Sequence, residues 1–258
     1  MSEPRPVREG REKAEAVRFE LGLGEAPIRD LFGFVERNYA VLVVRRPMPD
    51  GPEGALIRIG QRSLIVVNTS DCHLVRQRFT AAHELGHLVF DSASDPIQCD
   101  ESLSEVNTPV EMRANAFAVH LLLPAAVIRL RFLQPGFDLL DEKNIVSLAM
   151  EYGISGQSLS WHMKNVLGLT EGQRQQIAGI NEPFKIAMRL GMTDRVRQEK
   201  EAMGAIGWPR KYVSMAAKAY ESGRLDRQRL GEILEDERLV SAVVSDLAPI
   251  SAAAGQAR

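Results

Sequence analysis

The stretch LVRQRFTAAHELGHLVF, residues 74–90, decides how this chain is interpreted. Its apolar residues recur at helical spacing, and Ser70 precedes it at a position that suits an N-cap. We therefore predict a long helix that begins near Ser70 and ends near Asp91, where serine, aspartate and proline accumulate. Within this helix, His83 and His87 are four residues apart, so their imidazoles lie one turn apart on one face.

This histidine spacing is that of two ligands to one metal ion, and zinc suits a pair of imidazoles. Glu84 lies within about 100° of both histidines around the helix axis, near enough to reach water at the ion without being a ligand. A zinc ion with three protein ligands lowers the pKa of its water to about 7, and a neighbouring carboxylate can accept the proton. The pattern therefore predicts metal-assisted hydrolysis, most often of a peptide bond, with Glu84 as the base.

The alternative interpretation is a chance HExxH sequence on an amphipathic helix, with histidines that are merely exposed or satisfied in the core. The context of the motif favours the metal site. A predicted small sheet precedes the helix, and the small residues Ala81, Ala82 and Gly86 leave room for an ion and water.

A third ligand has to come from elsewhere, because three side chains on one straight helix rarely converge. Asp91 is strained in this role, and a loop carboxylate holds a metal less rigidly than one on a packed helix. We prefer Glu111, which begins the next predicted helix near Val110 and shares its face with small residues; the alternative is that Glu111 only compensates the helix dipole. His120 lies about 180° around that helix and is not expected to join the same ion. The candidates are Asp91, Asp95, Asp100, Glu101, Glu105 and Glu111.

The elements before the motif are two helices and a small sheet. We predict helices over 9–21 and from Pro27 onward, and strands over 40–44, 55–59 and 63–67, separated by turns that contain glycine. The strands are predicted to form a small antiparallel sheet. No strand is expected after Val67, and 92–109 is predicted to be a polar loop. Pro124 ends the helix that Glu111 begins, and further helices follow, so the fold class is α+β followed by an all-helical region.

The motif with its flanking segments resembles the ImmA/IrrE family of bacterial and phage metallopeptidases. The strings that carry the resemblance are ERNYAVLVV, SLIVVN, RQRFTAAHELGHLVF and EMRANAFAVHLLLP, in this order, and it extends over about 11–170. It implies a minimal thermolysin-like zincin domain of gluzincin type, with His83, His87 and Glu111 as ligands and Glu84 as base. It also implies cleavage of a helix-turn-helix repressor of the XRE type, which relieves repression. Asp91 departs from the histidine that many members have there.

For the residues after Pro135 we predict helices and no strands. Over 145–169 the pattern is that of a helix-turn-helix, with a turn at Gly153 and Ser155 as the cap of the second helix. Residues 136–170 hold four acidic residues and two lysines, so the element lacks the positive charge that phosphate contact requires. We favour packing or repressor docking over direct DNA binding. We divide the chain into a peptidase domain (1–135), this element (136–170) and a C-terminal helical domain (171–258), which either docks a partner or completes the core.

Composition sets the remaining expectations. The formal net charge of −2 gives no general attraction to nucleic acid or anionic membranes, and no secretion signal or apolar run suited to a membrane is present. Cys72 and Cys99 are not in a CxxC pair, which fits reduced thiols in the cytoplasm. Histidine and carboxylate ligands accept Mn²⁺ as well as Zn²⁺. The sequence indicates no oligomeric state.

The main interpretation is a site-specific zinc endopeptidase, and two other functions are alternatives to it. One is a regulatory protein that sequesters the repressor without cutting it, although binding alone does not require Glu84. The other is a DNA-binding regulator that uses 145–167. A peptidase also needs a hydrogen-bond donor to the oxyanion. His73 and His162 are both candidates for it, although a lone histidine is more often structural.

Overall fold

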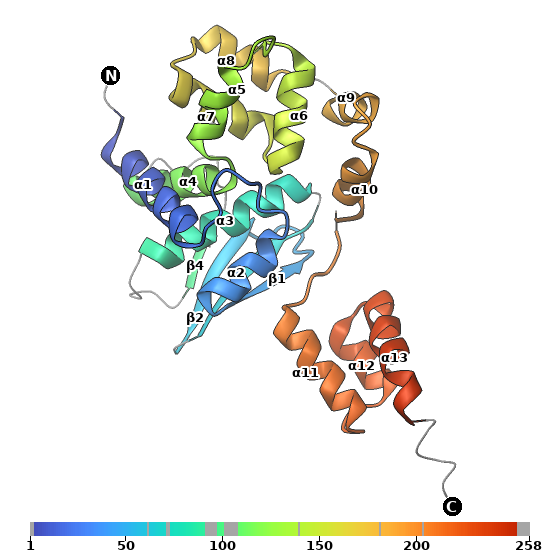
Figure 1. The fold of residues 1–258 in the computed structure, drawn as a ribbon. Coiled ribbons are helices and arrows are strands. Elements are labelled where there is room, and N and C mark those ends of the chain that lie inside the picture. Colours follow the sequence, from blue (N-terminus) through green and yellow to red (C-terminus); the bar gives the residue numbers. More distant parts are fainter. Residues whose placement is uncertain are drawn as a thin grey trace, which may run out of the picture.

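The computed structural model describes residues 3–60, 62–70, 73–90, 97–100, 108–138, 140–180, 182–202 and 204–251. Helices before and after a small sheet make up this part of the chain (Figure 1). The elements are α1 (Arg5–Glu20), α2 (Leu31–Tyr39), β1 (Val41–Arg46), β2 (Gly54–Ile59), β3 (Arg62–Asn68), α3 (Leu74–Phe90), β4 (Ile97–Asp100), α4 (Pro109–Leu122), α5 (Ala125–Phe132), α6 (Glu142–Tyr152), α7 (Gly156–Leu167), α8 (Glu171–Ala178), α9 (Pro183–Arg189), α10 (Thr193–Ala202), α11 (Arg210–Glu221), α12 (Arg227–Leu234) and α13 (Glu237–Ser251). The predicted α+β class with a following helical region is confirmed.

The sheet is mixed, with the strand order β1-β3-β2-β4. β2 is antiparallel to β3 and to β4, but β1 is parallel to β3, so the prediction of a purely antiparallel sheet is wrong. β3 lies between the two strands that precede it in the chain, so β1 and β2 do not form the hairpin that consecutive antiparallel strands would form. β4 was also missed, because a four-residue strand inside a polar segment is defined by its pairing with β2 and not by its own pattern.

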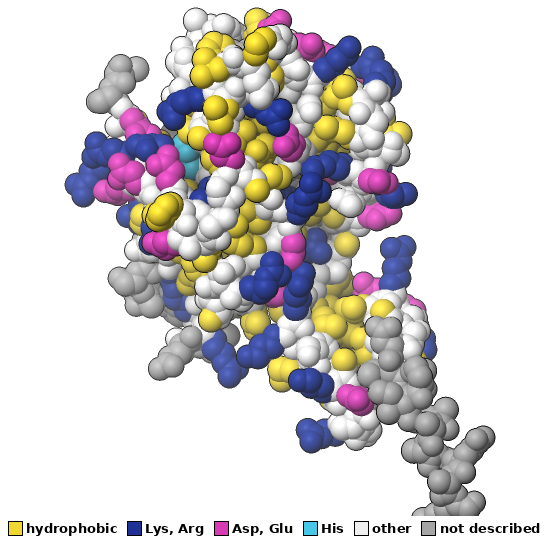
Figure 2. Space-filling view, in the orientation of Figure 1, with side chains coloured by type: hydrophobic (Ala, Val, Ile, Leu, Met, Phe, Trp, Pro, Cys, Tyr) yellow, Lys and Arg dark blue, Asp and Glu magenta, His cyan; other side chains and the backbone are white. Residues whose placement is uncertain are grey.

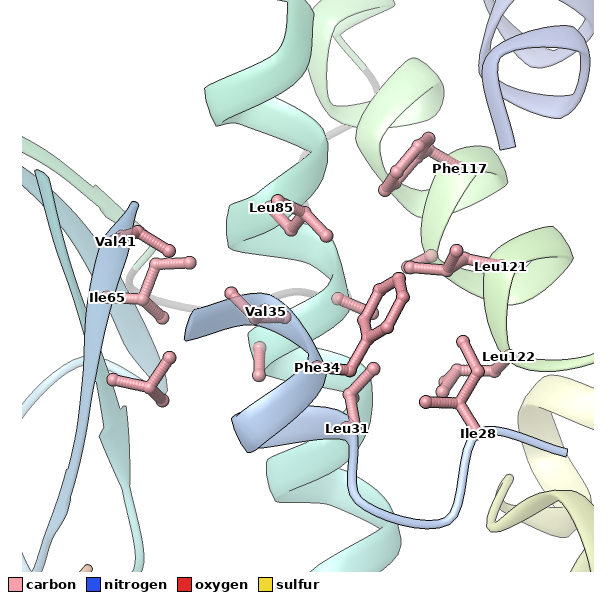
Figure 3. Packing of buried hydrophobic residues seen from close by; sticks show 14 of the residues in the cluster. Ile28, Leu31, Phe34, Val35, Val41, Ile65, Leu85, Phe117, Leu121 and Leu122 are labelled. Carbon is pink, nitrogen blue, oxygen red and sulfur yellow. The ribbon is translucent and has the colours of Figure 1, made fainter. Parts of the chain in front are cut away.

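Helices α2 and α3 cover one face of the sheet, and α4 packs on the far side of α3 (Figure 1). Figure 3 shows Val41 and Ile65 of the sheet directed toward Val35 of α2 and Leu85 of α3, with Phe117 of α4 completing the layer. All five side chains are at most 1% exposed. The helix that carries the HExxH motif therefore lies at the centre of the main hydrophobic core, which fixes its orientation.

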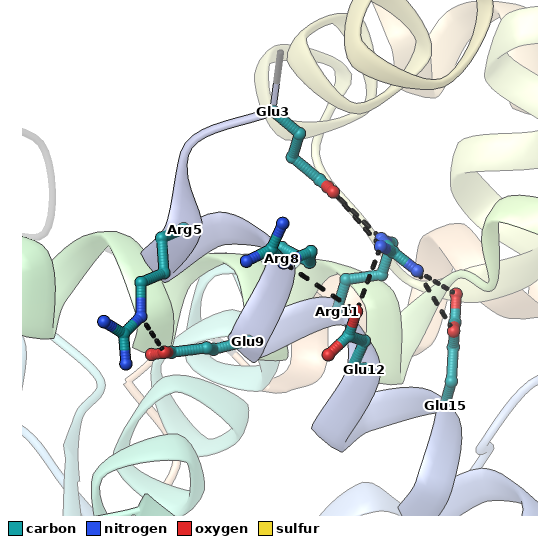
Figure 4. A network of polar contacts seen from close by, with 7 residues as sticks. All are labelled: Glu3, Arg5, Arg8, Glu9, Arg11, Glu12 and Glu15. Carbon is teal, nitrogen blue, oxygen red and sulfur yellow. Dashed lines mark hydrogen bonds and ion pairs between the residues drawn. The ribbon is translucent and has the colours of Figure 1, made fainter.

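Helix α1 packs along α4, and its outer face is charged. Gly10 allows the close approach, because a Cβ there would overlap the Arg113 carbonyl of α4. The buried Arg18 donates to the carbonyls of Gly24, Ala26 and Leu121, which ties the end of α1 to the end of α4. The exposed face carries the ion pairs drawn in Figure 4. Such surface pairs contribute little each, so the packing with α4 holds the helix.

Helix α3 begins at Leu74, not at Ser70 as predicted from the sequence. Its first turn is capped from another part of the chain: the carboxylate of Glu199 in α10, 6% exposed, accepts from the Val75 backbone N–H at 3.3 Å. Two residues further, the side-chain amide of buried Gln77 donates to the Ala202 carbonyl. Because a distant carboxylate satisfies the helix N-terminus, the local cap that the sequence offered is not used. Helix α2 also begins later than predicted, at Leu31 and not at Pro27, but here the N-cap is the adjacent Asp30, whose side chain accepts from the Gly33 N–H.

Arg78 joins α3 to the helix-turn-helix element. Its guanidinium donates to the carbonyls of Ile28 and Arg29 on one side and of Tyr152 and Gly153 on the other. Gly153 has φ 63° and ends α6, and a Cβ at this position would meet the Arg78 side chain. Glycine is required there both by the backbone conformation and by the space that the arginine occupies. Burial lowers the pKa of Arg78 to about 10.

The predicted helix-turn-helix pattern is confirmed as α6, a turn at Gly153 and α7, whose N-cap Ser155 accepts from the Ser158 N–H. Helices α5 to α8 share a second hydrophobic cluster, in which Leu123, Ile145, Leu159 and Ile177 are at most 1% exposed. The domain boundaries predicted from the sequence are not decided by these clusters and stay a prediction.

Helices α11 to α13 form a separate cluster around Leu230 and Leu234. Trp208 fills its side, and its indole N–H donates to the Leu234 carbonyl. The preceding segment is fastened to the edge strand β1, since Arg45 and Gly207 exchange two backbone hydrogen bonds of 2.8 Å. Among the described residues, no single helix has the length and apolar character to cross a membrane; by those two criteria alone the pair α4 and α5, bent by 54°, passes the test.

Candidate metal centre

The two histidines of the motif face each other inside the molecule. His83 is 0% exposed and His87 is 3% exposed, and their Nε2 atoms lie 3.0 Å apart. Both come from the second half of α3, where the four-residue spacing places them on one face. Two imidazole nitrogens with inward lone pairs repel each other unless a proton or an ion lies between them. The pair is therefore built to share a cation.

Glu111 completes the group from α4. Thr108 is the N-cap of this helix, with Pro109 in the first turn, and the Thr108 hydroxyl accepts from the Glu111 N–H at 3.3 Å. The Glu111 carboxylate lies 3.0 Å from His83 Nε2 and 3.4 Å from His87 Nε2. Its side chain is 16% exposed, so one side of the group is open to solvent. The helix start thus presents Glu111 to the histidines.

The three side chains fit a tetrahedral ion. One donor atom from each lies within 4.8 Å of the others. Two ligand atoms about 2.1 Å from a tetrahedral zinc ion lie about 3.4 Å apart, close to the separations of 3.0 to 3.4 Å here. Two imidazoles and one carboxylate are a donor set that zinc accepts, and three protein ligands leave a fourth position for water or substrate.

Asn115 orients the first histidine. Its Oδ1 accepts a hydrogen bond of 2.9 Å from His83 Nδ1, which leaves the Nε2 lone pair of His83 directed at the centre of the group. Asn115 lies one turn after Glu111 on α4, so one helix supplies both a candidate ligand and the support of another. The sequence analysis missed this role of Asn115; its spacing of four residues from Glu111 was the available signal.

The charge of the group favours a bound cation. Burial raises the pKa of the Glu111 carboxyl, but hydrogen bonds and charge from His83 and His87 outweigh it and lower the pKa to about 2. Glu111 is therefore an anion at neutral pH, and its negative charge would stabilise a cation held between the carboxylate and the two histidines.

Glu84 lies beside this group on the same helix and is 0% exposed. Its carboxylate packs against the start of β2, where Gly54 is the neighbouring residue. The small residues around the motif serve packing and do not leave the space that was expected from the sequence. Ala81 and Ala82 are buried in the main core, and a Cβ at Gly86 would lie 3.1 Å from the Ala114 Cα of α4.

The other residues considered from the sequence do not join the group or lie outside the described residues. His73 is exposed at the start of α3 and its ring contacts Phe184 at 5.2 Å. His162 is buried and donates to the Leu123 carbonyl, and its ring contacts His120 at 4.4 Å. Neither is placed to donate to an oxyanion at the group. The structure does not describe Asp91, Asp95, Glu101 and Glu105, nor the side chain of Asp100.

Residues 37–160 match the model of the Peptidase_M78 family, described as the IrrE N-terminal-like domain. The chain contains a domain of the ImmA/IrrE family. The ImmA/IrrE match spans the three grouped residues and Glu84, and it begins in α2 and ends in α7. No curated protein matches the chain. The match leaves out α1, which packs on α4, and α10, which caps α3, although both hold the two helices of the candidate metal centre.

The match of 37–160 to this peptidase family indicates a metallopeptidase domain. The geometry is compatible with it, since three side chains that could hold an ion converge, one side of the group is open, and Glu84 follows His83 on the same helix without being one of the three. The identity of the metal is a separate question, because the same donors accept manganese.

Proposed function

We propose that this chain is a zinc-dependent endopeptidase, in which His83, His87 and Glu111 hold the ion and Glu84 is the general base. The observation that carries the proposal is the convergence of the three side chains, with separations of 3.0 to 3.4 Å, beside a fully buried Glu84. A divalent ion held there would polarise the scissile carbonyl and lower the pKa of its water to about 7.

The chain's own residues perform the remaining tasks. Glu84 accepts the proton of the attacking water and returns it to the leaving amine, a role for which a carboxylate beside the ligands is suited. Asn115 keeps the His83 tautomer that leaves Nε2 unprotonated. Glu111 neutralises part of the ion's charge and links α4 to α3, so that the spacing of the two helices sets the ligand geometry.

The substrate we propose is a helix-turn-helix repressor of the XRE type, as the family resemblance implies. The helix-turn-helix element of this chain is then a packing or docking element and not a reader of DNA. Two cations, Lys164 of α7 and Arg174 of α8, support this view. Both pair with Glu171 at 2.6 Å, and both lie over the ring of Trp161. Cations engaged in this way contribute less to phosphate binding. Figure 2 shows acidic and basic side chains interspersed over the face in view.

The test is cleavage of a helix-turn-helix repressor of the XRE type, the substrate class that the family resemblance implies. The zinc-loaded protein is incubated with the purified repressor and the products are followed by intact mass spectrometry. We expect two fragments that sum to the repressor plus one water, and no fragments with Glu84→Gln, which retains the ligands and has nearly the same shape. Fragments with Glu84→Gln at the rate of the unmodified chain would contradict the assignment of the base.

The same experiment separates cleavage from sequestration. If the Glu84→Gln variant binds the intact repressor and relieves repression in cells as well as the unmodified chain does, the protein is a binding protein and not a peptidase. Retention of the unmodified chain on operator DNA at about 50 mM salt, lost as salt rises, would instead favour a DNA-binding regulator.

A further inference from the structure

One face of α3 lies on the start of β2. Arg76, Thr80 and Glu84 follow one another at intervals of four residues and therefore share a side of the helix. Arg76 pairs with Glu53, with Arg76 Nε 2.7 Å from Glu53 Oε2. The next two residues of this face meet Gly54, the first residue of β2. The start of β2 therefore packs against the face of α3 that carries Glu84.

Gly54 has no side chain in the direction of Glu84. A Cβ built on Gly54 would lie 2.7 Å from Glu84 Oε1 and 3.4 Å from its Cγ, and it would overlap the Thr80 methyl group. The φ angle of Gly54 is not among the positive ones, so the backbone conformation does not require glycine. Glycine inside a strand otherwise weakens the strand, and in this position it marks a close approach. Space for the side chains of α3 is the reason for it.

We propose that Gly54 is a positioning residue, which reserves the space in which the Glu84 carboxylate is held beside the metal ligands. The proposal rests on the role of Glu84 as the base. With a methyl group at Gly54, the strand cannot move easily, because this residue is paired with Val67 on one side and Asp100 on the other. The end of the Glu84 side chain is the softest neighbour and is displaced. A general base displaced by about 1 Å can lose up to about 100-fold in rate.

The first experiment compares Gly54→Ala with Gly172→Ala, a position with open space around it. In the repressor cleavage assay, we expect Gly54→Ala to lower kcat by 10-fold to 100-fold with little change in KM, while zinc stays at one per chain. Gly172→Ala is expected to match the unmodified chain. A Gly54→Ala protein that binds zinc and retains kcat within twofold would overturn the proposal.

A second variant separates displacement of Glu84 from general crowding. Gly54→Ala/Thr80→Ser removes the methyl group that the new Cβ would overlap but retains the hydroxyl that donates to the Arg76 carbonyl. We expect the double variant to recover thermal stability and not kcat. Recovery of both would show that the loss came from strain at Thr80, and it would overturn the role assigned to Gly54.

Crystal structures of the unmodified chain and of Gly54→Ala test the inference without any substrate. The expected difference is a changed position of the Glu84 carboxylate with the ligand residues unmoved. An unmoved Glu84 would overturn the proposal even if activity falls. If the unmodified chain holds zinc but cleaves no repressor, the proposed function fails, and the two structures still decide whether Gly54 positions Glu84.

Discussion

His83 Nδ1 of α3 donates to Asn115 Oδ1 of α4 at 2.9 Å. This bond joins the two helices of the candidate metal centre behind His83, a candidate ligand. Its acceptor, Asn115, lies one turn after Glu111 on α4. Because the other ring nitrogen of His83 faces His87 at 3.0 Å, the bond fixes the tautomer as well as the ring orientation.

Loss of this hydrogen bond is expected to lower the affinity for the metal and to leave the fold intact. Asn115→Ala should lower the affinity for zinc by 10-fold to 100-fold, the usual effect of removing a partner of a ligating histidine. Asn115→Asp keeps an acceptor and should retain most of the affinity. Titration of the metal-free protein against a zinc chelator measures both, with Asn165→Ala, at an exposed site on α7, as the control. Equal affinity in Asn115→Ala and the unmodified chain would argue against the assigned role.

The spacing of α3 and α4 depends on Gly86. A Cβ there would lie 3.1 Å from the Ala114 Cα and 3.3 Å from the Phe117 ring. Alanine in an open helical site such as Gly231 is expected to stabilise by up to about 1 kcal/mol. Gly86→Ala should instead destabilise by about 1 to 3 kcal/mol, because the added methyl group overpacks the contact between the helices.

Denaturant unfolding of Gly86→Ala and Gly231→Ala measures this difference. Zinc affinity should fall in Gly86→Ala alone, since separating the helices moves Glu111 from the histidines. If Gly86→Ala is stabilised and binds zinc with unchanged affinity, the space between α3 and α4 accommodates the methyl group, and the prediction is wrong.

The features that could be predicted from the sequence are those determined by residues within a single segment. The helix around His83 and His87, the helix that Glu111 begins and the turn at Gly153 follow from periodicity, spacing and capping residues within a few turns. The grouping of these residues is as expected, whereas their roles as ligands and base stay a prediction.

Features that depend on contacts between distant segments were not predictable in the same way. The place of β3 between β1 and β2 depends on how whole strands pair with one another, and the turns that connect consecutive strands do not reveal it. The true start of α3 depends on Glu199, 124 residues after Val75. Asn115 and Gly54 look like ordinary small or polar residues until the neighbouring element is in place.

Glu199 is expected to stabilise α3 as a distant cap. Glu199→Ala leaves the Val75 N–H without its acceptor and should cost about 0.5 to 2 kcal/mol. Glu201→Ala, at an exposed position of the same helix, should change the free energy of unfolding by less than about 0.5 kcal/mol. Chemical denaturation of the two variants makes the comparison. Equal effects would show that Glu199 contributes nothing specific to α3.

Buried histidines make stability depend on pH. Burial and the neighbouring histidine lower the pKa of His120 to about 2, and burial lowers that of His162 to about 4. The unfolded chain binds these protons near pH 6.5 and the folded chain does not, so stability is lost as pH falls from about 6.5 toward 4.

Each of the two histidines should contribute a slope of up to about 1.4 kcal/mol per pH unit in this range. His120→Gln and His162→Gln should each reduce the slope measured between pH 5 and 6. Urea unfolding at several pH values provides the data, and the difference between proteins removes the contribution of the carboxylates. An unchanged slope in both variants would contradict the burial of neutral histidines.

The most direct test of the metal centre is the zinc content of the purified protein and of His83→Ala, His87→Ala and Glu111→Ala, by mass spectrometry, with folding checked by circular dichroism. We predict one zinc ion per chain, lost in all three variants and retained in Glu84→Gln, which changes no ligand. Absence of bound metal after zinc is added, or folded variants that keep a full equivalent, would contradict the account.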